Sequence, residues 1–391
     1  MNGVKNLGIE LNQGQKKLIS EIKRFVKKAN DPLYVYSGPA GSGKTTVALE
    51  ALKQSGVGDN YMAVAFVGKA VLVLLMKGIK AVTIHSFIYR TYIERDENGK
   101  EVLRFMLKEK LQPEPRIILV DEGSMISDDM MEDLMSFGVQ IIMMGDINQL
   151  GPVFGHCSFM LNPNFMLTEV MRQALDNPII WLSQEVLKGR ELVPGNYGTS
   201  KVLTKRPENI HMFDNYDIIL AGKNATRDTI NDIFRFDILG RKDHFPVVGD
   251  KVICRQNVWD RTIDQFPLTN GTMGMITDID HSSMTKNKIN IDFKPDYLRG
   301  TFQNIEIGHK YIQLPHNERK EMGLTDFVKF EYGYCITVHM SQGSEYNRVL
   351  YLDEPMGDME HRKRLRYTAI TRAVDYVHVV KPTPRKFTKG W

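Results

Sequence analysis

The sequence Tyr-Val-Tyr-Ser-Gly-Pro-Ala-Gly-Ser-Gly-Lys-Thr-Thr-Val-Ala-Leu-Glu occupies residues 34–50 and contains the pattern Gly-x-x-x-x-Gly-Lys-Thr. The apolar run 33–36 predicts a buried strand before the glycines, and residues 47–49 begin a helical pattern after them. Glycines at such a junction let successive backbone N–H groups point at phosphate oxygens, and the positive end of the helix adds to the attraction. The stretch therefore predicts a phosphate-binding loop (P-loop) within an α/β fold.

Each part of this loop has an expected partner on a nucleoside triphosphate. Lys44 would reach the β- and γ-phosphates, and the hydroxyl of Thr45 would be a ligand for Mg²⁺. The residues expected to contact the nucleotide are Gly38, Pro39, Ala40, Gly41, Ser42, Gly43, Lys44, Thr45 and Thr46. The alternative is a glycine-rich turn that matches by chance, and it does not account for the strand and the helix on either side.

A second apolar run ends in two carboxylates. Residues 117–120 read Ile-Ile-Leu-Val, as expected for a central parallel strand, and Asp121 and Glu122 follow directly. Sheets of α/β proteins bind their ligands at this end of the strands. We expect Asp121 to hold Mg²⁺ and Glu122 to orient and deprotonate an attacking water. The alternative, an ordinary acidic turn, is weakened by the P-loop upstream.

Length and composition indicate a globular protein of two or three domains. The chain has 391 residues, 42% of them hydrophobic and 25% charged, and its net charge of +4 permits nucleic-acid binding without requiring it. Three widely separated cysteines form no metal or redox spacing, which favours a reduced, intracellular setting. The apolar window 62–82 is too interrupted by lysines to predict a membrane span.

Two segments depart from the α/β pattern. The β-favouring runs 89–94 and 102–107 flank an Asn-Gly pair, which is a strong hairpin signal. We expect this hairpin to protrude, either as a wedge beside a nucleic-acid groove or as a surface hairpin with no role. Short alternating strands with Asn/Gly turns between residues 249 and 330 predict a small inserted antiparallel barrel.

Polar side chains near other predicted strand ends and helix starts are further candidates. Gln15 lies in the first turn of a predicted helix, and its amide matches the adenine edge. Thr83 and His85 could bond to phosphates or sugars of a nucleic acid, although a capped loop with a structural histidine is an equal alternative. Gln149 is placed to sense the γ-phosphate. Arg372, between a helix and the last strand, could reach a phosphate with its planar fork.

Taken together, these stretches resemble a superfamily 1 DNA helicase of the RecD-like/Dda type, over residues 11–380. The matching motifs follow in order at residues 11–15, 38–45, 120–125, 145–150, 337–345 and 367–372. The resemblance implies an α/β fold of two RecA-like P-loop lobes with ATP and Mg²⁺ between them. It also implies single-stranded DNA bound across both lobes and movement from 5′ to 3′.

The resemblance assigns roles to individual residues. Arg172 and Arg372 look like the two arginine fingers that act on the transferring phosphoryl group. The full catalytic set is then Lys44, Glu122, Gln149, Arg172 and Arg372. Gly343 and Glu345 would contact the nucleotide together with Gln15 and the P-loop. The expected nucleic-acid contacts are Lys69, Thr83, His85, Thr337 and His339. One departure is that Phe66-Val67 stand where Pro-Thr is usual, so a threonine contact is lost.

The resemblance also implies a domain plan. Lobe 1A would comprise residues 1–87 and 109–163, and lobe 2A residues 164–255 and 331–391. A strand-separating pin, 1B, would lie at residues 88–108, with Tyr89, Tyr92 and Phe105 as candidates for its wedge. An SH3-like insertion, 2B, would lie at residues 256–330.

The expected partners are single-stranded DNA and forked or tailed duplexes, without a membrane. We expect a monomer in the cytoplasm of a bacterium or phage-infected host, serving replication, repair or recombination. An RNA helicase and a translocase that does not unwind stay open as alternatives. A non-enzymatic ATP switch is disfavoured, because it would need neither Glu122, Gln149 nor the two arginines.

Overall fold

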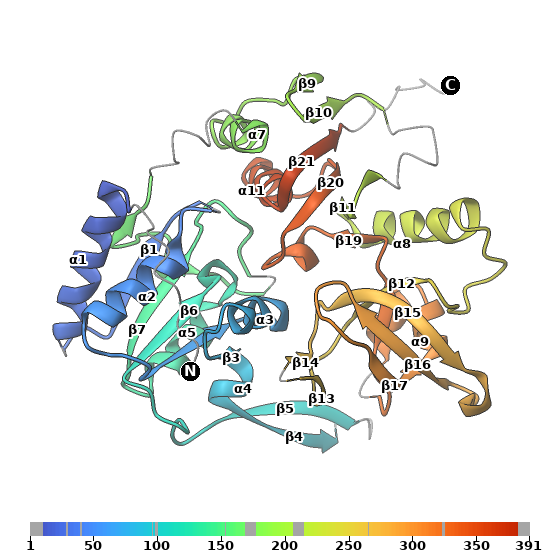
Figure 1. The fold of residues 1–391 in the computed structure, drawn as a ribbon, viewed down its shortest axis with the longest axis horizontal. Coiled ribbons are helices and arrows are strands. Elements are labelled where there is room, and N and C mark those ends of the chain that lie inside the picture. The colour runs from blue at the N-terminus through green and yellow to red at the C-terminus, as the bar shows by residue number, and fades with distance from the viewer. Residues whose placement is uncertain are drawn as a thin grey trace.

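The structure is a computed structural model, and it describes residues 11–28, 30–39, 41–95, 97, 101–152, 154–168, 177–205, 215–264, 266–322 and 325–381. Two parallel-stranded lobes lie side by side, and an antiparallel unit extends from the second lobe (Figure 1). None of the helices in these residues combines the length and the apolar character needed to cross a bilayer.

The first lobe is built on a six-stranded sheet in which every pairing is parallel, in the order β3-β2-β6-β7-β1-β8. Its strands are β1 (Leu33–Ser37), β2 (Tyr61–Ala65), β3 (Ala81–Thr83), β6 (Ile117–Asp121), β7 (Gln140–Gly145) and β8 (Phe165–Met166). Its helices are α1 (Gln13–Lys27), α2 (Lys44–Gln54), α3 (Gly68–Met76), α4 (Ile84–Ile88) and α5 (Asp128–Met135).

Alternate residues of the central strands face opposite layers of this lobe. Tyr36 and Leu119 pack with apolar residues of α1, α2 and α3, whereas Val35 and Val120 pack with α4 and α5. A strand that is buried on both faces reads as a continuous apolar run, because successive side chains point to opposite sides. This explains the unbroken apolar runs of β1 and β6, and it confirms the parallel α/β core that the sequence predicts.

The second lobe contains another six-stranded sheet, in the order β19-β11-β20-β21-β10-β9, with β9 antiparallel to its neighbour. Its strands are β9 (Gly195–Tyr197), β10 (Ser200–Leu203), β11 (Ile218–Ala221), β19 (Cys335–Thr337), β20 (Tyr346–Leu352) and β21 (Ala373–Val380). Its helices are α7 (Pro178–Leu187), α8 (Asn224–Ile233) and α11 (Met359–Ile370). α7 and α11 cover one face of the sheet, and α8 covers the other.

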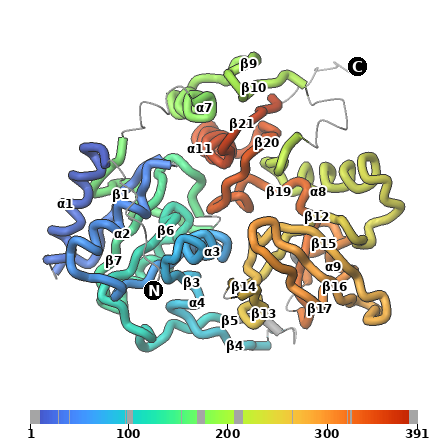
Figure 2. Tube along the Cα trace, viewed as in Figure 1, coloured from blue at the N-terminus to red at the C-terminus, as the bar shows by residue number. Residues whose placement is uncertain are grey.

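The antiparallel unit interrupts the second lobe between α8 and β19 (Figure 2). Its five-stranded sheet has the order β17-β16-β15-β12-β18. These strands are β12 (Lys251–Cys254), β15 (Met273–Asp280), β16 (Lys288–Pro295), β17 (Phe302–Gly308) and β18 (Phe330–Tyr332). The unit also contains the hairpin β13 (Val258–Ile263) and β14 (Phe266–Leu268), and the helices α9 (His309–Gln313) and α10 (His316–Glu321). β12 and β18 flank the predicted boundaries of 2B, which stay a prediction.

Buried ion pairs fasten this unit to the second lobe. The guanidinium of Arg227 in α8 lies 3.1 Å from the carboxylate of Glu331 in β18, and that of Arg319 lies 3.5 Å from it. Arg235 and Asp250, both fully buried, are 3.1 Å apart. A buried charge that loses its partner is strongly destabilising, so these pairs resist separation of α8 from the sheet.

A hairpin of β4 (Tyr89–Arg95) and β5 (Glu101–Leu107) leaves the first lobe after α4. Its register pairs Tyr89 with Leu107 and Arg95 with Glu101, so the Asn-Gly pair falls in the connection, which lies outside the described residues. The hairpin that the sequence predicts is therefore present. Short 3₁₀ turns occur at Gly123–Met125, Ser158–Met160, His281–Ser283 and His339–Ser341, and a π-helical turn at Phe234–Ile238.

Candidate functional site

A cavity of about 790 Å³ lies where the two lobes meet. The first lobe contributes the P-loop, the end of β6 and the loop after β7, and the second contributes residues just before β20 and just after α11. The lining residues predicted from the sequence are Gly41, Gly43, Lys44, Thr45, Thr46, Asp121, Glu122, Gln149, Gly343, Glu345 and Arg372. The structure thus brings together residues separated by more than three hundred positions. We call this space the nucleotide cavity.

The P-loop holds the conformation that its glycines predict. Gly41 and Gly43 have φ values of 75° and 78°, in the left-handed region that glycine adopts readily. The ammonium of Lys44 donates to the carbonyl oxygens of Gly38 at 2.8 Å and Pro39 at 3.0 Å, so it curls over its own loop. This lysine can exchange two neutral carbonyls for anionic phosphate oxygens, which bind an ammonium more strongly.

Gln15 has a structural task as well as its predicted one. Its side-chain oxygen accepts from the Asn12 backbone N–H at 3.0 Å, while the Asn12 side chain accepts from the Gln15 N–H at 2.7 Å. This reciprocal pair is a capping box at the start of α1. The Gln15 amide also donates to the Ser42 carbonyl at 3.0 Å. Gln15 therefore ties α1 to the P-loop, and its adenine contact stays a prediction.

Asp121 and Glu122 form a pair of adjacent carboxylates at the end of β6. Asp121 accepts the backbone N–H of Glu122 at 2.9 Å. Burial, followed by the charge of Glu122, raises the pKa of Asp121 to about 6. Glu122 also has a φ of 51°, a left-handed conformation that is uncommon for a residue with a β-carbon. Strained backbone of this kind is concentrated at functional sites.

The residues present fit a Mg²⁺ ion. A divalent cation would stabilise the charged form of Asp121, whose pKa is raised by burial and by the charge of Glu122, and Thr45 adds a hydroxyl oxygen in the same cavity. Among the described residues, no cluster of three or more His, Cys, Asp or Glu could enclose a metal. Mg²⁺ characteristically uses one or two carboxylates together with phosphate oxygens, so this small ligand set agrees with its preference.

The loop after β7 joins the two lobes. Asp146, which is buried, accepts a hydrogen bond from the hydroxyl of Tyr367 at 2.7 Å, and the Leu150 N–H donates to Thr368 at 3.0 Å. Both partners lie on α11 of the second lobe. Gln149 sits between these contacts, 2% exposed, and its side-chain oxygen has no hydrogen-bond partner. That oxygen is available to a ligand or a water in the nucleotide cavity.

Arg372 reaches the cavity from the C-terminal end of α11. It is 3% exposed, and its guanidinium donates to the carbonyl oxygens of Thr368 at 3.2 Å and Ser344 at 3.1 Å. Its own carbonyl accepts the N–H of Tyr346 at 2.8 Å. The arginine is thus held by backbone groups on both sides, with a fixed charge that faces the P-loop across the cavity. Arg172 and Ala40 lie outside the described residues.

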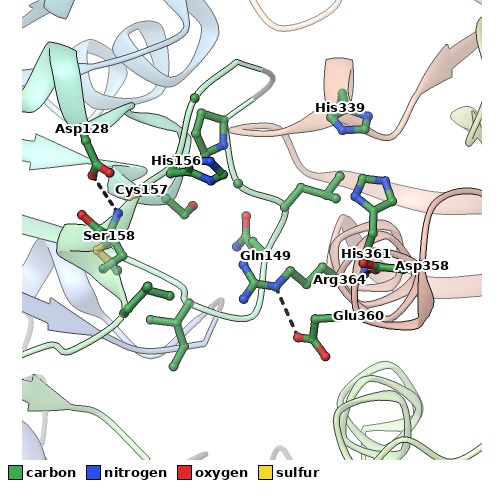
Figure 3. Close-up of a pocket in the computed structure, with 18 residues that line it drawn as sticks. Asp128, Gln149, His156, Cys157, Ser158, His339, Asp358, Glu360, His361 and Arg364 are labelled. Carbon is green, nitrogen blue, oxygen red and sulfur yellow. Dashed lines mark hydrogen bonds and ion pairs between the residues drawn. The ribbon is translucent and has the colours of Figure 1, made fainter.

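A second cavity of about 820 Å³ lies on the other side of the loop after β7 (Figure 3). Gln149 is the lining residue that the two cavities share. From the second lobe, His339 and His361 enter with their rings stacked at 6.0 Å, and Arg364 lies beside Glu360. Burial, and then His361, lowers the pKa of His339, so its ring is neutral near pH 7.

Three other predicted nucleic-acid contacts lie at two places: Thr83 and His85 at α4 of the first lobe, and Thr337 at the end of β19 in the second lobe. Thr83 caps α4, and the ring of His85 packs among Phe66, Tyr89 and Phe105 at the base of the hairpin, with centroid distances of 5.4–5.9 Å. Burial lowers the pKa of His85. Thr337 is buried and accepts from the Met340 N–H at 3.3 Å.

Lys69 lines the nucleotide cavity, and its predicted contact with nucleic acid stays a prediction. Tyr297, from the antiparallel unit, lines the same cavity and is absent from the residues that the sequence singles out. No local motif marks Tyr297, because it follows a strand in a part of the chain without P-loop character.

The fold and the site define a class: a P-loop nucleotide site shared by two parallel-sheet lobes. Comparison with protein families agrees, since an AAA domain matches residues 10–198 and a UvrD-like helicase C-terminal domain matches residues 332–380. The ATP-dependent RecD2 DNA helicase of Deinococcus radiodurans is 27% identical over 390 residues, a match that covers 89% of this chain and 46% of that protein. The chain therefore spans less than half the length of this relative.

Solved structures show the same fold. Bacteroides Pif1 bound to single-stranded DNA has a TM-score of 0.57 and 18% identity, with 94% of this chain and 92% of that chain covered. The Pif1 helicase of Candida albicans has a TM-score of 0.56 and 17% identity, with 95% and 94% covered. With these matches, the chain is similar to RecD/Pif1-type helicases of superfamily 1.

Proposed function

We propose that this chain is an ATP-dependent DNA helicase that moves from 5′ to 3′ along single-stranded DNA and separates the strands of a duplex. One observation carries the proposal: a single cavity collects the P-loop, two carboxylates, Gln149 and a buried arginine from two different lobes. A cavity shared between lobes changes shape when the lobes move, so nucleotide binding and lobe movement are linked. The helicases named above agree with this reading.

Within the nucleotide cavity, each side chain has a task that follows from its chemistry. Lys44 binds the β- and γ-phosphates, and Glu122 orients a water and accepts its proton. Arg372 places its guanidinium against the transferring phosphoryl group, and such arginines are worth about 10³–10⁵ in rate. Arg172 is proposed as a second finger. Thr45 and Asp121 would hold Mg²⁺, which neutralises charge on the phosphates when it is bound.

Gln149 is proposed to report the state of the nucleotide to the nucleic-acid surface. It lines both cavities, and its unpartnered oxygen can bond to the attacking water on one side. A shift of this loop would be passed to α11 through Asp146 and Leu150, which bond to Tyr367 and Thr368. Binding and release of phosphate therefore have a direct structural route to the second lobe.

We propose that the single strand crosses both lobes, contacting Thr83 and His85 on the first and Thr337 and His339 on the second. The hairpin is proposed as the pin, because Tyr92, Ile93, Phe105 and Met106 leave 47–62% of their surface exposed on it. Exposed apolar and aromatic side chains can stack on separated bases. Tyr89 is a weaker wedge candidate than Tyr92 or Phe105, since its hydroxyl bonds to Asp133 at 2.5 Å.

The domain plan expected from the sequence is kept in this proposal, with the first lobe extended to β8 (Phe165–Met166) and the antiparallel unit extended to β12 and β18. Lobes 1A and 2A correspond to the two parallel sheets, 1B to the hairpin and 2B to the antiparallel unit, which we propose to be SH3-like. Forked and tailed DNA are the proposed substrates, and the proposed working form is a monomer in the cytoplasm.

The test is strand separation with ATP on duplexes that carry a single-stranded tail at the 5′ or the 3′ end, with RNA-tailed duplexes alongside. We expect unwinding from the 5′ DNA tail alone. Unwinding from the 3′ tail alone would refute the polarity and the pin. Unwinding from RNA tails would point to an RNA helicase. Strand-stimulated ATP hydrolysis without unwinding would leave a translocase whose hairpin is an ordinary surface feature.

A further inference from the structure

The start of α3 is the place where the first lobe touches both the second lobe and the antiparallel unit. From there the side chain of Lys69 crosses to the second lobe. Its ammonium lies 4.7 Å from the ring centre of Tyr346 and 3.5 Å from the hydroxyl oxygen of the same residue. It also lies 5.8 Å from the ring centre of Tyr297 in the antiparallel unit. Both distances are within the range of cation–π attraction, about 6 Å.

The backbone around Lys69 is fitted to this arrangement. A β-carbon added to Gly68 would lie 2.6 Å from the Asn257 side-chain oxygen and 2.7 Å from the β-carbon of Thr269, both in the antiparallel unit. On the other side, a β-carbon added to Gly343 would lie 3.1 Å from Val67. Glycine at both positions is what lets three parts of the molecule approach α3 so closely.

Both tyrosines are held in place by their own contacts. The hydroxyl of Tyr297 donates to Thr272 at 3.0 Å, and the hydroxyl of Tyr346 approaches the sulfur of Met273 at 3.4 Å. The N–H of Tyr346 donates to the carbonyl oxygen of Arg372 at 2.8 Å. The ring that receives the Lys69 ammonium is therefore one hydrogen bond away from the proposed arginine finger.

We propose that Lys69, Tyr346 and Tyr297 form an interlobe contact that positions Arg372 over the P-loop, so that Lys69 acts as a positioning residue rather than as a nucleic-acid contact. This inference rests on the function proposed above. Lys69 and Tyr297 line the nucleotide cavity, and the contact joins the first lobe to both the second lobe and the antiparallel unit. Losing it lowers the fraction of molecules in which Arg372 is correctly placed.

The two roles of Lys69 make different predictions. A lysine that neutralises a phosphate makes single-strand binding sensitive to salt, with a contribution of about 0.7 to the slope of log K against log salt. A lysine that holds Tyr346 leaves that slope unchanged and acts on turnover at saturating single strand and ATP. A cation–π contact of this kind shifts an equilibrium by about fivefold to thirtyfold when it is partly desolvated.

The experiment compares Lys69→Gln, Tyr346→Leu and the double variant with the unmodified chain. It measures strand-stimulated ATP turnover at saturation, and it measures the affinity for a fluorescent oligothymidine at several salt concentrations. We expect each single variant to lower saturated turnover by about fivefold to thirtyfold, and the double variant to be no slower than the slower single one. The affinity and its salt slope should stay as they are.

Three further variants act as controls. Tyr346→Phe keeps the ring and should keep most of the turnover, and Lys69→Arg keeps a cation that also binds aromatic faces. Lys80→Gln removes an exposed charge from the same lobe, outside both cavities, and should change nothing. If Tyr346→Leu fails to fold, Lys69→Gln, Lys69→Arg and Tyr346→Phe still distinguish the two roles of Lys69.

The inference is overturned if Lys69→Gln lowers the affinity and the salt slope while Tyr346→Leu does not, or if the two losses in turnover multiply in the double variant. Failure of the proposed function has a different signature. In that case the unmodified chain would show no strand-stimulated hydrolysis, and oligothymidine would not change its ATP turnover at any concentration.

Discussion

The left-handed backbone of Glu122 leads to a prediction about both stability and activity. Its φ of 51° and ψ of 43° place it in the αL region, which costs a residue with a β-carbon roughly 1–2 kcal/mol. Glycine escapes this penalty but makes the unfolded chain more flexible, a loss of about 0.4–1 kcal/mol. The difference leaves Glu122→Gly more stable than Glu122→Ala by roughly 0.5–1 kcal/mol.

The comparison with alanine isolates the backbone. Both variants remove the same carboxylate from beside Asp121, so any relief of charge repulsion is common to them. Only the β-carbon differs. The conformation itself is held by the Glu122 N–H, which donates to Asp121 at 2.9 Å, and by its carbonyl, which accepts from Met125 at 3.0 Å. Neither bond involves the Glu122 side chain, so both survive the substitutions.

The assay is urea unfolding of the glycine, alanine and glutamine variants of Glu122, followed by measurement of their strand-stimulated ATP turnover. We expect Glu122→Gly to unfold at a higher urea concentration than Glu122→Ala, and both to lose about 10²–10⁴ in turnover, since a general base contributes that much. Glu122→Gln should lose activity equally while keeping the strain. An alanine variant as stable as the glycine variant would refute the strain argument. A glutamine variant with full turnover would refute the role of Glu122 as the base.

Four other perturbations test separate parts of the molecule. Arg372→Ala should lower strand-stimulated ATP turnover by about 10³-fold or more while leaving nucleotide binding within a few fold, and normal turnover would rule out the finger. Phe105→Ser should reduce unwinding of a 5′-tailed duplex without reducing ATP turnover on single strands, whereas equal losses in both would mean that the hairpin acts elsewhere. Because burial lowers the pKa of His339, its unfolded form gains a proton first, so stability is lost as the pH falls through the ordinary value near 6.5. His339→Gln should reduce that loss in urea unfolding between pH 8 and pH 6, and an unchanged profile would contradict the assignment. Asp250→Ala leaves the guanidinium of Arg235 buried without its carboxylate and should destabilise the protein by about 3–5 kcal/mol, and a urea midpoint near that of the unmodified chain would contradict a buried pair.

Local features of this molecule could be predicted from its sequence because their causes are local. The strand, loop and helix around Lys44 follow one another directly in the chain. The glycines that the loop requires can be read from the same stretch of sequence. The hairpin was predictable for the same reason, since its two runs flank an Asn-Gly pair and its register closes there. The comparisons confirm the predicted helicase type.

Contacts between distant residues could not be predicted in this way. Lys69 and Tyr346 are 277 positions apart, and the sequence around neither residue indicates that the two are in contact. A resemblance placed Lys69 on the nucleic acid, whereas its observed neighbours are Tyr297 of the antiparallel unit and Tyr346 of the second lobe. Gln15 is a similar case. Its side-chain amide caps α1 and bonds to the P-loop, and a motif match alone does not distinguish this structural role from adenine recognition. The order of the strands in each sheet depends on how the whole chain packs, so it could not be predicted from the sequence either.

The buried ion pairs between α8 and the antiparallel unit have a mechanical consequence. Glu331 is surrounded by guanidinium groups of Arg227, Arg319 and Arg255, at distances of 3.1–3.5 Å. Swinging the unit away from the second lobe would pull Arg227 of α8 away from Glu331, where water cannot replace the lost partner. The unit and the lobe must therefore turn as one stiff arm. The arm contacts the first lobe at the glycine that begins α3, so a small rotation about this contact would move the far end of the arm over a much larger distance.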